Sequence, residues 1–221
     1  MRPLLLASSS PRRRELLALG GWTFQVRPAH VDETTWPGED PAAYVQRLSV
    51  AKARWVGADA PDRALVIGAD TVVVLDDHII GKPVDANDAL RILESLRGRV
   101  HEVFTGLTVL DTATRQAHTQ LARSRVPMRH YGDEEVRTYI ATGDPLDKAG
   151  AYAIQHAGFQ PVDAGRFADC FANVMGLPLC HLLRQLRCLN VDSFTDLPAA
   201  CQHFIPYDCP VFERILKEDP C

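Results

Sequence analysis

The sequence has no long hydrophobic run and no excess of basic residues. No window approaches the roughly 18 uncharged apolar residues that a membrane-spanning helix needs, and the first apolar run, residues 4–7, is too short for the core of a signal peptide. We therefore expect a cytoplasmic protein that does not bind membranes. The formal net charge of -4 offers no basic face for displacing counterions from a nucleic-acid polymer. Any phosphate site has to be a local basic pocket.

Cysteine is missing from the first three quarters of the chain. No pair of cysteines has the CxxC spacing of a common zinc site. We interpret the cysteines as buried apolar thiols with exposed ones near the end, and not as a disulfide framework. The alternative is a metal or cluster site built from Cys188, Cys201 and Cys209. The six positions are Cys170, Cys180, Cys188, Cys201, Cys209 and Cys221.

Several catalytic signatures are missing as well. The chain contains no GxSxG, no HExxH and no GxxxxGK[ST], and none of its eight histidines has the spacing of a metal site. A nucleophilic serine triad, a zinc protease and a Walker-type nucleotide site are therefore not indicated.

Strand and helix patterns alternate along the chain. The strongest strand pattern is residues 64–75, which are rich in β-branched side chains and apolar on both faces, so we predict a central strand. A hairpin turn is expected at Asp76-Asp77. The alternation predicts an α/β fold with a mixed, twisted sheet flanked by helices. The other predicted strands are 4–7, 24–27, 100–110 and 117–128, and the predicted helices are 11–19, one after Asp40-Pro41, one after Asp85, 134–141 and 179–189.

The stretch from Ser8 to Arg14 has the residues of an anion site. Ser8, Ser9 and Ser10 precede a proline at a helix start, and three arginines follow within one turn. Free backbone amides at a helix N-terminus and guanidinium groups both bind phosphate. An equally good local interpretation is a capped surface helix with solvated arginines.

Asp70 lies within the predicted central strand. A buried carboxylate there is costly unless a cation or hydrogen bonds compensate it. We expect the small neighbours Gly68 and Ala69 to let a phosphate or metal approach the backbone. The alternative, an aspartate that caps a strand end, is weaker because apolar residues continue to Leu75.

Further charged and polar residues complete a phosphoryl-transfer set. Glu33, Lys52 and Lys82 are each ordinary surface charges when taken singly, but together they provide metal ligands and charge neutralisers. Gly81 gives backbone freedom and Pro83 holds the chain extended, so we expect them to aim the Lys82 ammonium group at a phosphate. Gln155 follows a segment of small residues around Tyr152, and its amide can read the edge of a base.

Eight short blocks follow one another along the chain. They are Ser8-Ser9-Ser10-Pro11-Arg12-Arg13, Asp32-Glu33, Lys52-Ala53, Gly68-Ala69-Asp70-Thr71, Gly81-Lys82-Pro83, His101-Glu102-Val103-Phe104-Thr105, Asp147-Lys148-Ala149-Gly150-Ala151-Tyr152 and Asn173-Val174-Met175-Gly176-Leu177-Pro178. The blocks and their order resemble the Maf family, over about residues 3 to 187. Residues 167–172 and those after 187 depart from the family pattern. We therefore predict a Maf-like domain at 1–187 and a divergent cysteine-containing tail at 188–221.

The resemblance implies a two-lobed Maf/ITPase-like fold with a central cleft, a homodimer, and hydrolysis of nucleoside triphosphates to monophosphate and pyrophosphate with Mg²⁺ or Mn²⁺. It implies that Asp70 and Glu33 are catalytic and hold the metal. The segment that ends in Gln155, Ala-Tyr-Ala-Ile-Gln, resembles the sequence of the family branch that acts on dTTP and UTP. A 7-methyl-GTP or other modified-purine pyrophosphatase, or a non-catalytic nucleotide-binding regulator of cell division, stays open. The implied substrate-binding residues are Ser8, Arg12, Arg13, Lys52, Thr71, Lys82 and Gln155, with Arg12, Thr71 and Gln155 at positions tied to substrate choice.

Overall fold

A six-stranded mixed sheet forms the centre of the structure, a computed structural model that describes residues 2–218. The strands are β1 (Leu4–Leu6), β2 (Phe24–Val26), β3 (Leu65–Leu75), β4 (His78–Ile80), β5 (Val100–Asp111) and β6 (Ala117–Pro127). Their order is β2-β1-β3-β5-β6, with β4 paired to β3. β1 is parallel to β2 and β3, and the other pairs are antiparallel. The predicted mixed α/β fold is confirmed.

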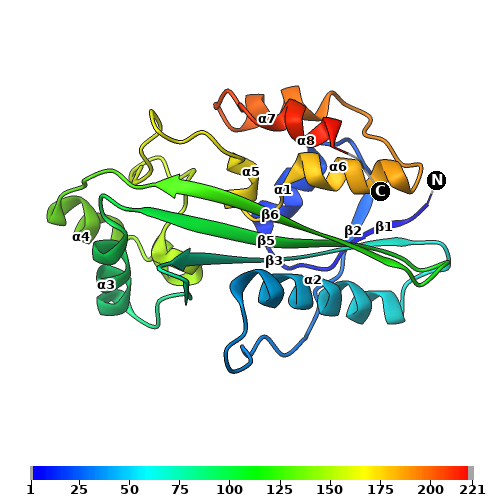
Figure 1. Ribbon diagram of the computed structural model, residues 1–221, viewed down its shortest axis with the longest axis horizontal. Coiled ribbons are helices and arrows are strands. Elements are labelled where there is room, and N and C mark those ends of the chain that lie inside the picture. The colour runs from blue at the N-terminus through cyan, green and yellow to red at the C-terminus, as the bar shows by residue number, and fades with distance from the viewer. Residues whose placement is uncertain (1, 219–221) are drawn as a thin grey trace.

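Helices cover both faces of this sheet and one end of it (Figure 1). α2 (Pro41–Ala58) lies on one face, and α1 (Pro11–Ala18), α5 (Phe171–Val174) and α6 (Leu179–Cys188) lie on the other. A second lobe surrounds the far end of the long strands. It consists of α3 (Ala86–Leu96), α4 (Asp133–Ala141) and the 3₁₀ turns η1 (Asp144–Asp147) and η2 (Ala149–Ala151). No helix among residues 2–218 is long and apolar enough to cross a membrane.

β3 is the predicted central strand, and it is buried along almost its whole length. Its side chains alternate between two apolar layers, as the period of a strand requires. Val72 and Val74 pack with Val45 and Leu48 of α2, whereas Ile67 belongs to the main core on the opposite face. The even-numbered residues of β3 therefore face α2, and Asp70 is one of them.

One edge of β3 is paired only at its two ends. β1 pairs with residues 65–67, and β4 pairs with residues 73–75. Between them, residues 68–72 have β5 on one side and, among the described strands, no strand on the other. Asp70 and Thr71 lie in this gap, so side chains from both faces of the sheet reach one opening.

The predicted helix starts are confirmed by their capping bonds. The Ser10 hydroxyl accepts a hydrogen bond from the Arg13 amide, the Asp40 carboxylate from two amides at the start of α2, and Asp85 from the Asp88 amide. The turn at Asp76-Asp77 is also confirmed, with φ of 51° and 62°. These local signals set helix and strand starts within a residue or two.

The residues after α6 contain helices that the sequence did not predict. α7 (Leu197–Phe204) and α8 (Phe212–Lys217) pack against α6, and their residues Leu197 and Ile215 are buried in the main core. Pro198 does not break this segment. It lies in the first turn of α7, where a missing backbone N–H has no intrahelical partner to lose.

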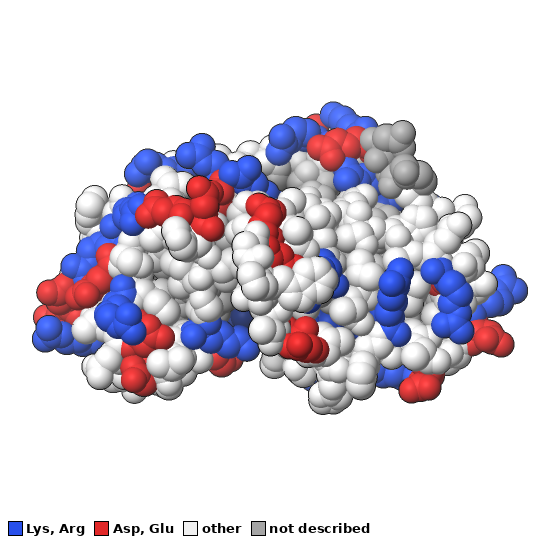
Figure 2. Space-filling model, turned by 60° about the horizontal axis from the view of Figure 1, so that its bottom comes forward, with Lys and Arg blue, Asp and Glu red and all other residues white. Residues whose placement is uncertain are grey.

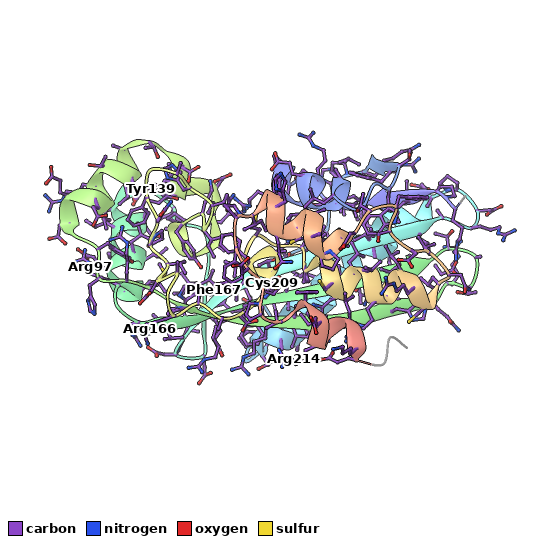
Figure 3. The ribbon with its side chains drawn as sticks, turned by 90° about the horizontal axis from the view of Figure 1, so that it is seen from above. Arg97, Tyr139, Arg166, Phe167, Cys209 and Arg214 are labelled. Atoms are coloured by element: carbon purple, nitrogen blue, oxygen red, sulfur yellow. The ribbon has the colours of Figure 1, made fainter. Side chains whose placement is uncertain are left out.

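Four of the cysteines are free, but the expectation of thiols throughout is wrong for Cys188, which is disulfide-bonded. Cys170, Cys180, Cys201 and Cys209 line one apolar cavity of about 20 Å³, and Figure 3 shows Cys209 midway along the molecule. Burial raises the pKa of Cys180 to about 12 and that of Cys201 to about 11, so these thiols stay protonated. Cys221 lies outside the described residues.

Candidate active site

A cleft of about 680 Å³ opens at the gap beside β3. Residues of both lobes line it, including segments from α1, α2, β3, β4 and η2. The structure brings all of the predicted site residues together here. They are Ser8, Arg12, Arg13, Glu33, Lys52, Asp70, Thr71, Lys82 and Gln155.

Lys52 joins the two predicted catalytic carboxylates. Its Nζ lies 2.6 Å from Asp70 Oδ1 and 2.7 Å from Glu33 Oε1. Asp70 and Lys52 are buried, whereas the Glu33 side chain is 57% exposed. The ammonium group compensates the buried carboxylate of Asp70, as a carboxylate in a central strand requires.

Gly68 brings α2 close enough for this pairing. A Cβ at Gly68 would lie 2.2 Å from the Ser49 carbonyl oxygen, and one at Gly106 would lie 2.2 Å from the Val45 carbonyl oxygen. Because these two glycines lack a side chain, the backbone of α2 can pack directly on β3 and β5. Ala69 is fully buried in the main core on the other face of the sheet. The expectation that Gly68 and Ala69 make room for a phosphate or metal is wrong, because helix packing fills that space.

Arg13 lies on the other side of the gap, where it connects three segments. Its Nε donates to the Gly176 carbonyl oxygen at 2.8 Å, and its Nη2 donates to Thr71 Oγ1 at 3.1 Å. A longer bond of 3.4 Å joins its Nη1 to Ser8 Oγ. Burial lowers the pKa of Arg13, and the charge of Asp70 opposes that shift. Arg13 lines the cleft and also holds the walls of the cleft together.

Positive charge exceeds negative charge in the lining. Five cationic side chains and three carboxylates face the cleft. Within residues 2–218, neither Arg12 nor Lys82 forms an ion pair, so both charges are available to a ligand. Charges of both signs are interspersed over the face in Figure 2. The cleft therefore suits a small polyanion.

The far wall of the cleft carries Gln155 and contacts the Lys82 loop. The Gly150 amide donates to the Gly81 carbonyl oxygen at 3.1 Å. The backbone freedom expected of Gly81 is not used in this structure, because its φ is not positive and an added Cβ would touch nothing within 4 Å. Gln155 is exposed, so its amide can reach a ligand.

Tyr44 is a lining residue that the sequence analysis missed. Its hydroxyl donates to the Glu33 carbonyl oxygen at 2.8 Å, which fixes the segment that carries Glu33. Burial and the negative charges of Asp70 and Glu33 raise the pKa of Tyr44 to about 12. The helical spacing of Tyr44, Leu48 and Lys52 on one stripe of α2 is the signal that could have found it.

The carboxylates of Asp70 and Glu33 suit a hard divalent cation. Both supply oxygen donors, and both already converge on one positive centre, the Lys52 ammonium. Mg²⁺ is commonly held by one or two carboxylates, with phosphates and water completing its shell. Among residues 2–218 no group of three or more His, Cys, Asp or Glu is arranged to hold a metal. A bound cation would thus depend on ligands from the nucleotide and water.

A known protein family matches most of this chain. Residues 3–189 match the family described as Maf-like protein, so the chain is a member of the Maf-like family. It is 45% identical over 187 residues to the dTTP/UTP pyrophosphatase of Geobacter sp. (strain M21), covering 85% of this chain and 95% of that protein. It is 43% identical over 194 residues to the nucleoside triphosphate pyrophosphatase of Synechococcus sp. (strain JA-2-3B'a(2-13)), covering 88% and 97%.

A solved structure, the nucleoside-triphosphatase or dITP/XTP pyrophosphatase from Mycobacterium abscessus, overlaps this fold in part. The TM-score is 0.39 with 13% identity, covering 57% of this chain and 74% of that one.

Proposed function

We propose that this protein hydrolyses nucleoside triphosphates between the α and β phosphates, releasing a monophosphate and pyrophosphate. The observation that carries the proposal is the lining of the cleft. Lys52 pairs there with the carboxylates of Asp70 and Glu33, whereas Arg12 and Lys82 have no ion pair among the described residues. Relatives that align over nearly their whole length are named as pyrophosphatases of this kind. The arrangement provides both a site for water and a site for phosphate charge.

Each group has a distinct task in the proposed reaction. Asp70, with Glu33, would hold Mg²⁺ or Mn²⁺, which when bound supplies positive charge to the phosphate oxygens. Asp70 orients or deprotonates the attacking water, and Lys52 keeps the two carboxylates in place. Arg12, Lys82 and the amides at the start of α1 neutralise charge on the departing pyrophosphate.

The test of the reaction is Asp70→Asn, assayed by pyrophosphate release with Mg²⁺ and with Mn²⁺. Lys52 retains Glu33 as a partner, so the variant should fold, and turnover should fall by about a thousandfold or more while nucleotide binding partly survives. Asp77→Asn, in an exposed turn with a φ that asparagine tolerates, is the matched control. Near-normal turnover by folded Asp70→Asn protein would falsify the proposed mechanism.

For the base, we propose a preference for dTTP and UTP. The relative from Geobacter is named for these nucleotides, and the exposed amide of Gln155 offers both a donor and an acceptor to a pyrimidine edge. Gln155→Glu should lower kcat/KM for UTP and dTTP relative to purine nucleotides. A panel that shows 7-methyl-GTP or another modified purine as the best substrate of the wild type establishes the alternative instead. Nucleotide binding without pyrophosphate release by the wild type would favour the other alternative, a non-catalytic nucleotide-binding regulator of cell division.

The proposal includes a homodimer and a cytoplasmic location. The resemblance to the family supports the homodimer, and the sequence features described above support the location. Light scattering of the purified protein tests the first, and fractionation of cells tests the second.

A further inference from the structure

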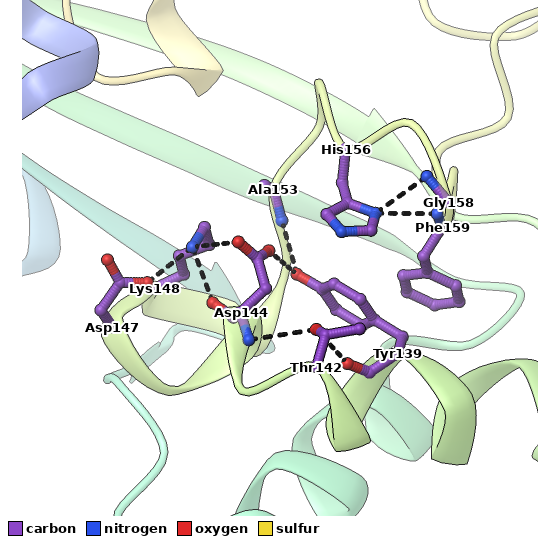
Figure 4. A network of polar contacts seen from close by, with 9 residues as sticks. All are labelled: Tyr139, Thr142, Asp144, Asp147, Lys148, Ala153, His156, Gly158 and Phe159. Carbon is purple, nitrogen blue, oxygen red and sulfur yellow. Dashed lines mark hydrogen bonds and ion pairs between the residues drawn. The ribbon is translucent and has the colours of Figure 1, made fainter.

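The wall of the cleft that carries Gln155, residues 149–155, is held from outside by a polar network. Tyr139 of α4 lies at its centre, in the second lobe (Figure 3). The Ala153 amide donates to the Tyr139 hydroxyl at 3.2 Å, and this hydroxyl donates to Asp144 Oδ2 at 2.7 Å. Lys148 Nζ completes the chain by donating to Asp144 Oδ1 at 2.9 Å (Figure 4). The network thereby connects Lys148, the residue just before the wall, with Ala153, two positions before Gln155.

The network has fixed donor and acceptor roles. Burial, followed by the hydrogen bond to Asp144, raises the pKa of Tyr139, so its hydroxyl keeps its proton. Burial tends to raise the pKa of Asp144 too, but hydrogen bonds from Lys148 and Tyr139 outweigh it and the pKa is lowered. Asp144 is thus an anion that accepts from both neighbours, and the Tyr139 oxygen is free to accept from Ala153.

The ring of Tyr139 also contacts the segment on the other side of Gln155. It packs edge-on against the ring of His156 at 4.8 Å between centroids and stacks on Phe159 at 4.5 Å. His156 Nδ1 accepts hydrogen bonds from the amides of Gly158 and Phe159, at 3.1 and 2.9 Å (Figure 4). Gln155 therefore lies between Ala153, which bonds the hydroxyl of Tyr139, and His156, which contacts its ring.

We propose that Tyr139 is a positioning residue that fixes the direction of the Gln155 side chain and so sets the choice of base. This inference rests on the proposed function, because it assigns the selectivity of that same cleft. Tyr139 does not line the cleft, so it acts only through the wall. When the Tyr139 hydroxyl is removed, the buried Ala153 amide loses its hydrogen-bond acceptor, and the wall moves so that the amide can find another.

The test compares Tyr139→Phe with Tyr131→Phe. Tyr131 is an equally buried tyrosine of the same lobe that also packs on Phe159, but its hydroxyl donates to the Leu93 carbonyl oxygen, away from the cleft. In Tyr139→Phe, the ratio of kcat/KM for UTP to that for ATP should fall about tenfold, mainly through a higher KM for UTP. The ratio for Tyr131→Phe should stay within about twofold of the wild type. An unchanged ratio in Tyr139→Phe, or an equal fall in both variants, overturns the proposal.

Amide hydrogen exchange separates this inference from the proposed function. Tyr139→Phe should speed exchange at Ala153 and its neighbours in the wall, and Tyr131→Phe should not. Faster exchange with no pyrophosphate release by the wild type would remove the proposed function and leave Tyr139 as the residue that holds the wall. Normal turnover by the wild type with unchanged exchange in Tyr139→Phe would remove the positioning role alone.

Discussion

Replacing Gly68 by alanine should damage both stability and catalysis. The added Cβ would lie 2.2 Å from the Ser49 carbonyl oxygen and 2.8 Å from the Ala53 nitrogen, and contacts under 3.0 Å essentially do not occur. Because both neighbours are backbone atoms, α2 or β3 has to move by about 1 Å. Overpacking of this kind costs about 1–3 kcal/mol. For a chain of this size that lowers Tm by about 2–12 °C.

The same movement separates catalytic groups. Lys52 lies one residue before Ala53 on the displaced face of α2, and its bond to Asp70 is 2.6 Å long. A misplacement of about 1 Å can cost up to about a hundredfold in rate. We therefore expect kcat/KM for pyrophosphate release to fall by more than partial unfolding of the variant can explain. The assay is run at a temperature at which circular dichroism shows that the variant is folded.

Gly165→Ala provides the control. Its φ is not positive, and an added Cβ would meet only Asp163 Oδ1 at 3.6 Å. It should leave both Tm and kcat/KM close to the wild type. A Gly68→Ala variant that melts within about 1 °C of the wild type and keeps its kcat/KM would refute this prediction.

Two further predictions concern residues outside the lining of the cleft. Burial lowers the pKa of His101 to about 3 from 6.5, so the unfolded chain binds a proton that the folded one does not, and stability falls as pH drops below 6.5. The free energy of unfolding of His101→Gln, which can still hydrogen-bond to Tyr152, should fall by about 2 kcal/mol less than that of the wild type between pH 8 and pH 5. Urea unfolding at the two pH values measures this difference, and an equal pH dependence of the two proteins refutes the prediction. Serine at Cys188, Cys201 and Cys209 should lower Tm but leave pyrophosphate release largely intact, since none lines the cleft. A loss beyond about a hundredfold in folded protein would bring the tail into the mechanism.

The local elements of the fold were predictable because their signals lie within a few residues. Ser10, Asp40 and Asp85 cap the helices that they were expected to cap. The apolar run of β3 identified the central strand. α7 was not predicted because a proline within a helix usually breaks it. That Pro198 lies in the first turn, where it is tolerated, is evident only once the helix is seen packed on α6.

The candidate site was predictable as a set of residues but not as a geometry. Residue types and block order singled out Asp70, Glu33 and Lys52 from the sequence alone. Only the tertiary structure decided that Lys52 bridges the two carboxylates, because that depends on how closely α2 packs at Gly68. Such packing joins residues far apart in the chain and leaves no local pattern.

By itself, the sequence determined the mixed α/β class, the helix starts and the chemistry available for a phosphate ligand. The tertiary structure decided where that chemistry meets, at the stretch of β3 that neither β1 nor β4 reaches. It also decided that Tyr139 holds the wall before Gln155 and that Gly68 serves helix packing. The physical reason is that hydrogen bonds and close packing between distant segments depend on the register and separation of whole elements, whereas caps and apolar periods depend on neighbouring residues alone.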